Sequence, residues 1–101
     1  MNENIIFEWD EEKRQRNITE HGIDFIEAVS VFDDPQVSFF FDTRKDYGEE
    51  RFNAYGQSNG RCIRVCFTMR GKNIIRVISM FKVHKKEWNR YYEDRMFFLK
   101  I

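Results

Sequence analysis

The chain has 101 residues with seventeen basic and seventeen acidic side chains, and 42% of its residues are hydrophobic and 17% aromatic. A chain of this length normally forms one domain, and so many aromatic residues exclude an intrinsically disordered protein. No apolar run reaches the roughly 18 residues that a transmembrane helix needs, and the N-terminus lacks the pattern of a secretory signal. We therefore expect a single cytoplasmic domain over residues 1–101 that has no contact with a membrane.

The charges are divided unevenly along the chain. Residues 1–60 hold six basic and fourteen acidic side chains, whereas residues 61–101 hold eleven basic and three acidic ones. Halves of opposite sign predict a polyanionic partner for the basic half. The alternative is that the two halves interleave in space and that their charges cancel.

The first predicted elements are one strand and two helices. The stretch "IIFEWD" alternates apolar and polar residues with the period of a half-buried strand. Asp10 before "EEKRQRNITEH" and Gly22 after it are start and stop signals, which predict a helix over residues 11–21. Asp24 and Glu27 form a capping-box pattern for a second helix, which ends before Pro35. The predicted apolar stripe of this second helix consists of Phe25, Ala28, Val29 and Phe32.

The rest of the chain reads as four strands and a last helix. The strands are "VSFFFD", "ERFNAYG", "RCIRVCFT" and "NIIRVISM", and "SNG" and "MRGKN" are typical of tight turns. A helix is expected from about His84 to Arg95, followed by an apolar tail at residues 96–101. The order β-α-α-β-β-β-β-α predicts an α+β domain, with an antiparallel sheet and helices packed mainly on one face.

The two cysteines, Cys62 and Cys66, lie four residues apart in one predicted strand. That spacing separates their Cα atoms by about 13 Å, too far for a disulfide. His21 and His84 are the only histidines and show no metal-ligand spacing with the cysteines, so we expect no metal site. Two thiols suit a reducing cytoplasm.

Strand alternation places two arginines on a face that the helices leave open. Arg64 points away from its apolar neighbours in the third of the four strands, and Arg76 does so in the fourth. In that last strand, Arg76, Ile78 and Met80 are expected to share one face. The guanidinium fork suits phosphate. The alternative is that each arginine pairs with a carboxylate from the acidic half.

Several stretches in this order resemble the BrnT family of type II toxin–antitoxin ribonucleases. They are "FEWDEEKRQRNITEHGIDFIEAVSVFDDP", "GEERFNAYG" and "FTMRGKNIIRVIS" followed by a lysine, and they span nearly the whole chain. The resemblance implies a RelE-like fold and a metal-independent endoribonuclease that needs no cofactor. It also implies a cognate BrnA-like antitoxin, with operator DNA bound only through the toxin–antitoxin complex.

One departure from the family pattern falls at the end of the last strand. Met80 and Phe81 stand where the family commonly has Ala and Arg, although Lys82 is retained. Phe81 then either stacks on a base, as aromatic residues do with single-stranded RNA, or belongs to the core. The departure favours a second reading, a weakened or inactive RelE-like nucleic-acid-binding module or co-repressor.

Metal-free RNA cleavage uses the 2′-OH of the substrate as nucleophile and needs a base, donors for the developing charge, and an acid. The candidate donors are Arg64, Arg76 and Lys82. His21 is the candidate for proton transfer, since histidine titrates near neutral pH. The alternative is that His21 supports the C-terminus of its helix.

The candidate RNA-binding residues surround these groups in the sequence. The helix stripe at i, i+4 and i+8 consists of Lys13, Asn17 and His21. In "EERF", Arg51 is a candidate phosphate clamp, and Glu50 is read as a partner in a cross-strand ion pair. The complete RNA-binding set is Lys13, Arg51, Phe81, His84 and Lys85.

Overall fold

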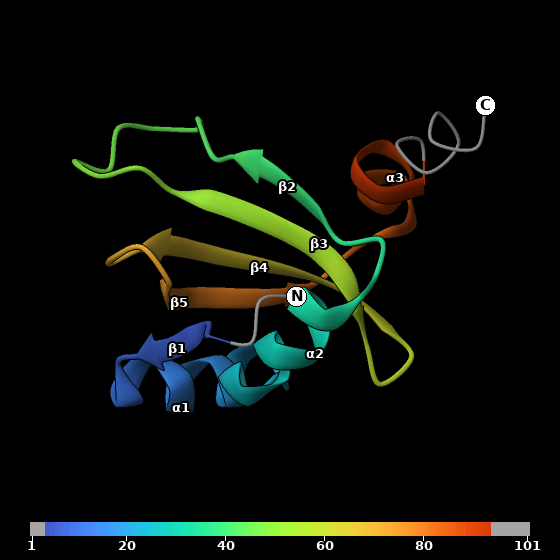
Figure 1. Ribbon diagram of the computed structural model, residues 1–101. Coiled ribbons are helices and arrows are strands. Elements are labelled where there is room, and N and C mark those ends of the chain that lie inside the picture. Colours follow the sequence, from blue (N-terminus) through green and yellow to red (C-terminus); the bar gives the residue numbers. More distant parts are fainter. Residues whose placement is uncertain (1–3, 94–101) are drawn as a thin grey trace.

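The computed structural model describes residues 4–93 and shows a five-stranded sheet with helices packed against it (Figure 1). The predicted element order and the α+β class are confirmed. The apolar tail at residues 96–101 and the predicted helix end at Arg95 lie outside the described residues. None of the described helices is long and apolar enough to cross a membrane. The elements are β1 (Ile6–Trp9), α1 (Glu11–His21), the 3-10 turn η1 (Phe25–Glu27), α2 (Ala28–Asp33), β2 (Ser38–Phe41), β3 (Phe52–Ser58), β4 (Arg61–Met69), β5 (Ile74–Lys82), α3 (Lys85–Trp88) and the π-helical turn η2 (Asn89–Glu93).

The sheet is mixed rather than antiparallel. Its strand order is β1-β5-β4-β3-β2, with β1 parallel to β5 and the other three pairs antiparallel. The prediction of a fully antiparallel sheet is therefore wrong at the β1 edge. A parallel pair needs a long connection, and the whole segment from α1 to β4 separates these two strands. Because no tight turn joins β1 to β5, the local sequence pattern does not determine their relative direction.

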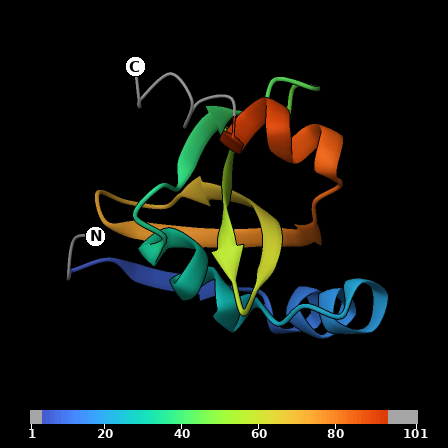
Figure 2. The same ribbon diagram turned by 90° about the vertical axis from the view of Figure 1, so that its right-hand side faces the viewer.

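The helices pack on both faces of the sheet, which corrects the second part of the fold prediction. η1 and α2 cover the main core, where the buried side chains include Phe25, Val31 and Val65. On the opposite face, α3 and η2 cover one end of the sheet through Trp88 and Tyr92. Figure 2 shows α1 below and α3 above the end of β5. Most of that second face is therefore framed by α1 and α3 rather than covered.

Local signals in the sequence explain most element boundaries. The Asp10 side chain accepts a hydrogen bond from the backbone of Lys13, and Gly22 ends α1 in the left-handed region. Asn59 and Gly60 both have positive φ in the two-residue turn between β3 and β4, which suits a type I′ hairpin. The capping box of the second helix is not formed, because the carboxylate of Glu27 bonds to the β3–β4 hairpin instead.

The second helix begins with a 3-10 turn rather than with the predicted α-helical turn. Its first turn is the 3-10 turn η1, which changes the phase of the following residues. Val31 is consequently buried, whereas Val29 of the predicted stripe is 43% exposed. The other members of the stripe, Phe25, Ala28 and Phe32, are buried as predicted.

A bulge in β5 changes which residues face the core. Cys66 pairs with Ser79 and Phe67 with Val77, so Ile78 is an extra residue in β5. Beyond it, the alternation is shifted by one residue, and Met80 is fully buried opposite Val65. The prediction that Met80 shares a face with Arg76 is wrong for this reason.

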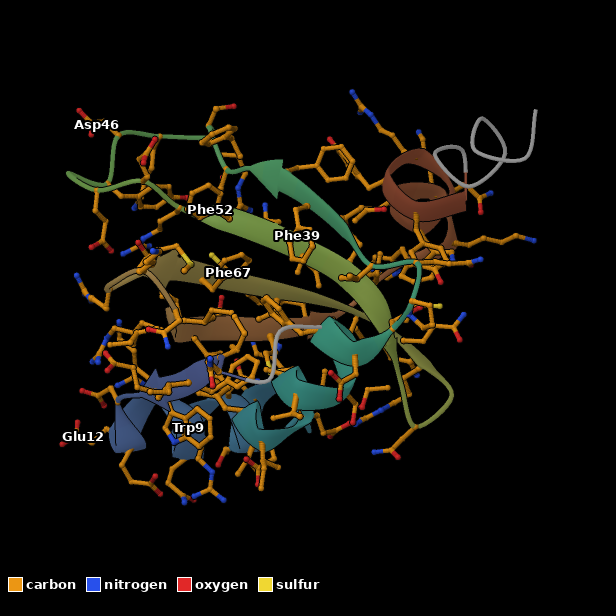
Figure 3. The ribbon with its side chains drawn as sticks, in the orientation of Figure 1. Trp9, Glu12, Phe39, Asp46, Phe52 and Phe67 are labelled. Carbon is orange, nitrogen blue, oxygen red and sulfur yellow. The ribbon has the colours of Figure 1, made fainter. Side chains whose placement is uncertain are left out.

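The core face beside Phe32 of α2 is apolar and partly open. Phe39, Phe52 and Phe67 lie together there, on β2, β3 and β4 (Figure 3). With Met69 and other apolar side chains they line a pocket of about 320 Å³ without polar surface. A surface of this kind does not suit the polyanionic partner that the charge distribution predicts.

Candidate active site

The face of the sheet opposite the main core, called the polar face below, carries most of the candidate residues. Strand register and the β5 bulge place polar side chains from β3, β4 and β5 on it. They are Asn53, Tyr55, Arg64, Cys66, Thr68, Arg76 and Ser79, with Phe81 at the end of β5.

A groove runs along this face between α1 and the second half of β5, and it is called the α1–β5 groove below. It exists because β1 pairs only with Ile74–Val77, so that no strand covers the edge of β5 beyond the bulge. Its volume is about 240 Å³. Its lining consists of Lys13, Arg16, Asn17, Glu20, His21, Ile78, Ser79 and Phe81.

Asn17 fixes α1 against this open strand edge. Its side-chain amide donates to the carbonyl oxygens of Ile23 (2.9 Å) and Met80 (3.1 Å). Its oxygen accepts from the backbone N–H of Met80 at 3.1 Å, and the side chain is buried. Asn17 therefore takes the place of a neighbouring strand. It is a structural residue of the predicted stripe, and it positions Lys13 and His21 along the groove.

Phe81 lies between two candidate catalytic residues. The His21 ring contacts it edge to face at a centroid distance of 4.7 Å, and the Arg64 guanidinium lies 4.7 Å from the same centroid. The His21 ring centroid and Arg64 Cζ are therefore no more than about 9.4 Å apart. Phe81 is half-buried on the polar face and does not join the main core. The structure thus brings together His21, Arg64 and Phe81, and Lys13 lines the same groove two turns back along α1.

Arg64 is held in place from the side of α3. Its Nη1 donates to Glu87 Oε2 at 2.7 Å, and the hydroxyl of Tyr55 donates to the same oxygen at 2.7 Å. Burial, and then the hydrogen bond to Glu87, raise the pKa of Tyr55. The phenol therefore stays protonated and keeps donating, which orients both Glu87 and Arg64.

Arg76 lies apart from this cluster. Its Nη1 donates to Glu8 Oε2 at 2.9 Å, across the parallel pair of β5 and β1. Its register partner Thr68 follows Arg64 by four residues on β4, a separation of about 13 Å along the strand. Arg64 and Arg76 share the polar face as predicted, but they do not converge on one point.

Other arginines of the basic half also pair with acidic residues from the first half of the chain. Arg61 bonds to Glu27 and Arg70 to Glu49, as Arg76 does to Glu8. At these three points the oppositely charged halves interleave. Arg64 differs, because its carboxylate partner belongs to the basic half.

The candidate donor Lys82 and the remaining predicted RNA-binding residues lie away from the α1–β5 groove. Arg51 stacks on Tyr47 at 4.1 Å and pairs with Glu49. Glu49 also pairs with Arg70, so in the described part of the chain the ion pair predicted for Glu50 is made by Glu49. Exposed residues beyond the cluster are Lys82, His84 and Lys85. Strand alternation directs Lys82 to the face opposite Phe81. His84 occupies the N-cap position of α3, but its side chain makes no capping hydrogen bond.

A buried carboxylate that the sequence did not single out also lies on this face. The side chain of Asp42 is fully buried, bonded to Arg44 at 2.7 and 2.8 Å and to Tyr47. The hydrogen bonds from Arg44 lower the pKa of Asp42 to about 2. Burial raises the pKa of the Cys66 thiol, and the nearby Asp42 raises it further. Cys66 is therefore protonated and unreactive.

The structure adds Tyr55, Glu87, Asn53 and Asp42 to the polar groups of this face. A lone polar residue in an apolar strand, as in "FFFD", is the one sequence signal that Asp42 offers.

Both cysteines are thiols, as predicted. Within residues 4–93, no three His, Cys, Asp or Glu side chains are grouped as metal ligands.

Comparisons with known proteins identify the family of this chain. Residues 9–87 match the family model described as the ribonuclease toxin BrnT of type II toxin–antitoxin systems. The 1.1 Å crystal structure of the Brucella abortus ribonuclease toxin BrnT is similar, with 34% sequence identity and a TM-score of 0.65. The match covers 81% of this chain and all of the Brucella chain. A comparison with curated proteins found no match. The predicted resemblance is confirmed, and the chain belongs to the BrnT family of ribonuclease toxins of type II toxin–antitoxin systems.

Proposed function

We propose that this chain is a metal-independent endoribonuclease that uses the 2′-OH of its RNA substrate as the nucleophile. The observation that carries the proposal is the placement of His21 and Arg64 on either side of Phe81, at the α1–β5 groove. The His21 ring centroid and Arg64 Cζ are at most about 9.4 Å apart, which is short enough for one nucleotide bound over Phe81 to reach both groups.

The two residues take different roles in this reaction. His21 is exposed at the end of α1 and is assigned proton transfer, either from the 2′-OH or to the leaving 5′-oxygen. Arg64 keeps a permanent charge, and Glu87 holds its guanidinium in a fixed orientation. A preorganised donor of this kind typically contributes about 10²–10³ in rate. Lys13 and Phe81 are assigned the binding and positioning of RNA in the groove.

The side chains of the groove support catalysis by cationic residues rather than by a metal ion held by carboxylates. Lys13, Arg16 and His21 line it together with a single carboxylate, Glu20. Divalent cations such as Mg²⁺ are held mainly by carboxylate and carbonyl oxygens. Arg76 and Arg51 lie farther along the polar face, where they are assigned contacts to the flanking RNA backbone. Lys82, His84 and Lys85 extend the basic surface beyond β5.

A second candidate function is an inactive nucleic-acid-binding module or co-repressor. The observation in its favour is that Phe81 occupies the centre of the cluster, where the family commonly has arginine. Arg64 covers one side of the Phe81 ring, which leaves less of the ring for stacking on a base. Phe81 therefore supports His21 and Arg64, and it offers RNA only the part of its ring that these two residues leave open.

Membership of a type II toxin–antitoxin family implies an antitoxin as partner. We propose a BrnA-like antitoxin that neutralises this chain in the cytoplasm, with operator DNA bound only through the complex. The relation to RelE-like ribonucleases is likewise proposed, supported by a small sheet with a polar face.

The reaction class is tested with a defined single-stranded RNA incubated with the purified chain in EDTA. Cleavage is expected to continue in EDTA and to stop at a site whose 5′ nucleotide carries a 2′-deoxyribose. Cleavage that EDTA abolishes, or that continues at the 2′-deoxy site, would contradict the proposal. A growth assay with and without the co-expressed antitoxin tests the toxin role separately.

A further inference from the structure

A second pocket on the polar face lies between the end of β2 and α3, and it is called the β2–α3 pocket below. Its floor includes Asn53, Tyr55 and Arg64, and its walls include Phe40, Glu87 and Tyr91. Its volume of about 150 Å³ is half of the roughly 300 Å³ at which pockets for drug-sized ligands begin. That size suits a single heterocyclic base.

We propose that the β2–α3 pocket binds one base of the RNA substrate and that the preferred base is guanine. The inference rests on the proposed ribonuclease function for the source of the base. It adds a recognition site next to the catalytic cluster, since Arg64 borders both the pocket and the Phe81 ring.

The pocket contains buried polar atoms without partners. Asn53 is only 8% exposed, and its Oδ1 has no hydrogen-bond partner among the described residues. The same holds for Nε of Arg64 within the described part of the chain. Buried polar groups are nearly always hydrogen-bonded. A ligand that donates to Asn53 Oδ1 and accepts from Arg64 Nε would satisfy both atoms.

Aromatic rings form the side of the pocket. Phe40 and Tyr91 meet edge to face at 5.0 Å, and Tyr91 stacks on Tyr55 at 5.0 Å and 13°. Phe40 and Tyr91 are both half-buried, so part of each ring remains accessible. Proteins that recognise single-stranded RNA commonly stack unpaired bases on such rings and bond to their Watson–Crick edges.

The polar groups of the pocket select among the bases. Glu87 is fixed through its Oε2, which accepts from Tyr55 and Arg64 at 2.7 Å each. Two acceptors of the pocket, Asn53 Oδ1 and the Glu87 carboxylate, lie beside the donor Arg64 Nε, whereas the Asp42 carboxylate and the Arg44 guanidinium of the lining are paired with each other. Guanine is the base whose Watson–Crick edge has the most N–H donors, and these lie next to its O6 acceptor. Adenine, cytosine and uracil leave more of the acceptors unsatisfied.

The test is a titration of the full ¹⁵N-labelled chain with GMP, followed by NMR. GMP is expected to shift the side-chain signals of Asn53 and Arg64 Nε–H, with AMP, CMP, UMP and ribose 5-phosphate producing smaller shifts. Glu87→Gln should weaken GMP binding at least fivefold, whereas Asp33→Asn, an exposed carboxylate on α2, should leave it unchanged. If Glu87→Gln does not fold, Tyr91→Leu supplies the comparison, because it removes ring surface without breaking the Glu87 hydrogen bonds.

Two results would overturn the inference: the absence of shifts at Asn53 and Arg64 with GMP, or equal shifts with the other nucleotides or ribose 5-phosphate. The titration is independent of catalysis. A chain that binds GMP in this pocket but cleaves no RNA contradicts the proposed function alone. A chain that cleaves RNA but binds no GMP here contradicts this inference alone.

Discussion

Replacing Asn17 with alanine should destabilise the domain more than its position on a polar helix suggests. The substitution removes three hydrogen bonds, to the Ile23 carbonyl and to both backbone groups of Met80. A typical hydrogen bond contributes about 1 kcal/mol net, and an unsatisfied buried group costs about 1–3 kcal/mol. The expected loss is about 3 kcal/mol of unfolding free energy, a large part of the roughly 5–15 kcal/mol of a typical domain.

Urea unfolding followed by circular dichroism measures this loss. With a slope of about 1–3 kcal/mol per molar urea, the midpoint of Asn17→Ala should fall by about 1–3 M. Thr19→Ala, on the exposed side of the same helix, is the matched control and should change stability by less than about 0.5 kcal/mol. If the two variants unfold within about 1 kcal/mol of each other, Asn17 does not tie α1 to β5.

Asn17→Asp adds a test by pH. An aspartate keeps the acceptor for Met80 N–H but directs a carboxylate at the carbonyl oxygens of Ile23 and Met80, so its folded-state pKa should be raised. The protonated form can still donate one hydrogen bond. Its stability is then greatest below the unfolded pKa of about 3.9 and is lost as pH rises through the folded pKa. A variant that is equally stable, relative to wild type, at pH 4 and pH 7 would refute this account.

Two further predictions concern stability on either side of the sheet. Asp42→Asn should cost about 1–2 kcal/mol at pH 7, because the lowered pKa of Asp42, about 2, reflects favourable bonds to the partly exposed Arg44. This contribution is present above the unfolded pKa of the carboxyl and is lost as pH falls toward 2. In urea unfolding, the stability difference between wild type and Asp42→Asn should therefore be smaller at pH 3 than at pH 7. Equal differences at the two pH values would contradict this prediction. Gly56→Ala should destabilise by about 1–3 kcal/mol, since a Cβ there would lie 2.8 Å from the Val31 carbonyl oxygen. Gly71→Ala, whose Cβ would meet no atom closer than 3.4 Å, is the control, and equal thermal midpoints for the two variants would show that α2 yields at Val31.

Local signals made the fold largely predictable. Asp10 and Gly22 bound α1 as predicted, because a side-chain cap and a left-handed glycine are encoded within a few residues. The turn at Asn59 and Gly60 is equally local. The direction of β1 and the bulge at Ile78 depend on pairing between distant segments, and no short pattern encodes them.

Some residue types of the candidate site followed from the sequence, but their contacts did not. The family resemblance is confirmed, His21 and Arg64 both contact Phe81, and Lys13 lines the same groove. Asn17 looked like another member of the polar stripe, but its backbone partners on β5 are distant in sequence. Glu87 was missed for the same reason, because it is one carboxylate in a basic segment and its contact to Arg64 arises only when α3 folds over the sheet.

The proposed function places RNA cleavage at the α1–β5 groove, in the cluster around Phe81. The most direct test is the cleavage rate of a defined single-stranded RNA by wild type, His21→Ala and the Thr19→Ala control, at equal folded concentrations. A general acid or base contributes about 10²–10⁴ in rate, so His21→Ala should lose at least a hundredfold while Thr19→Ala stays within twofold of wild type. A His21→Ala variant that cleaves as fast as the control would contradict the claim and place the reaction elsewhere on the polar face.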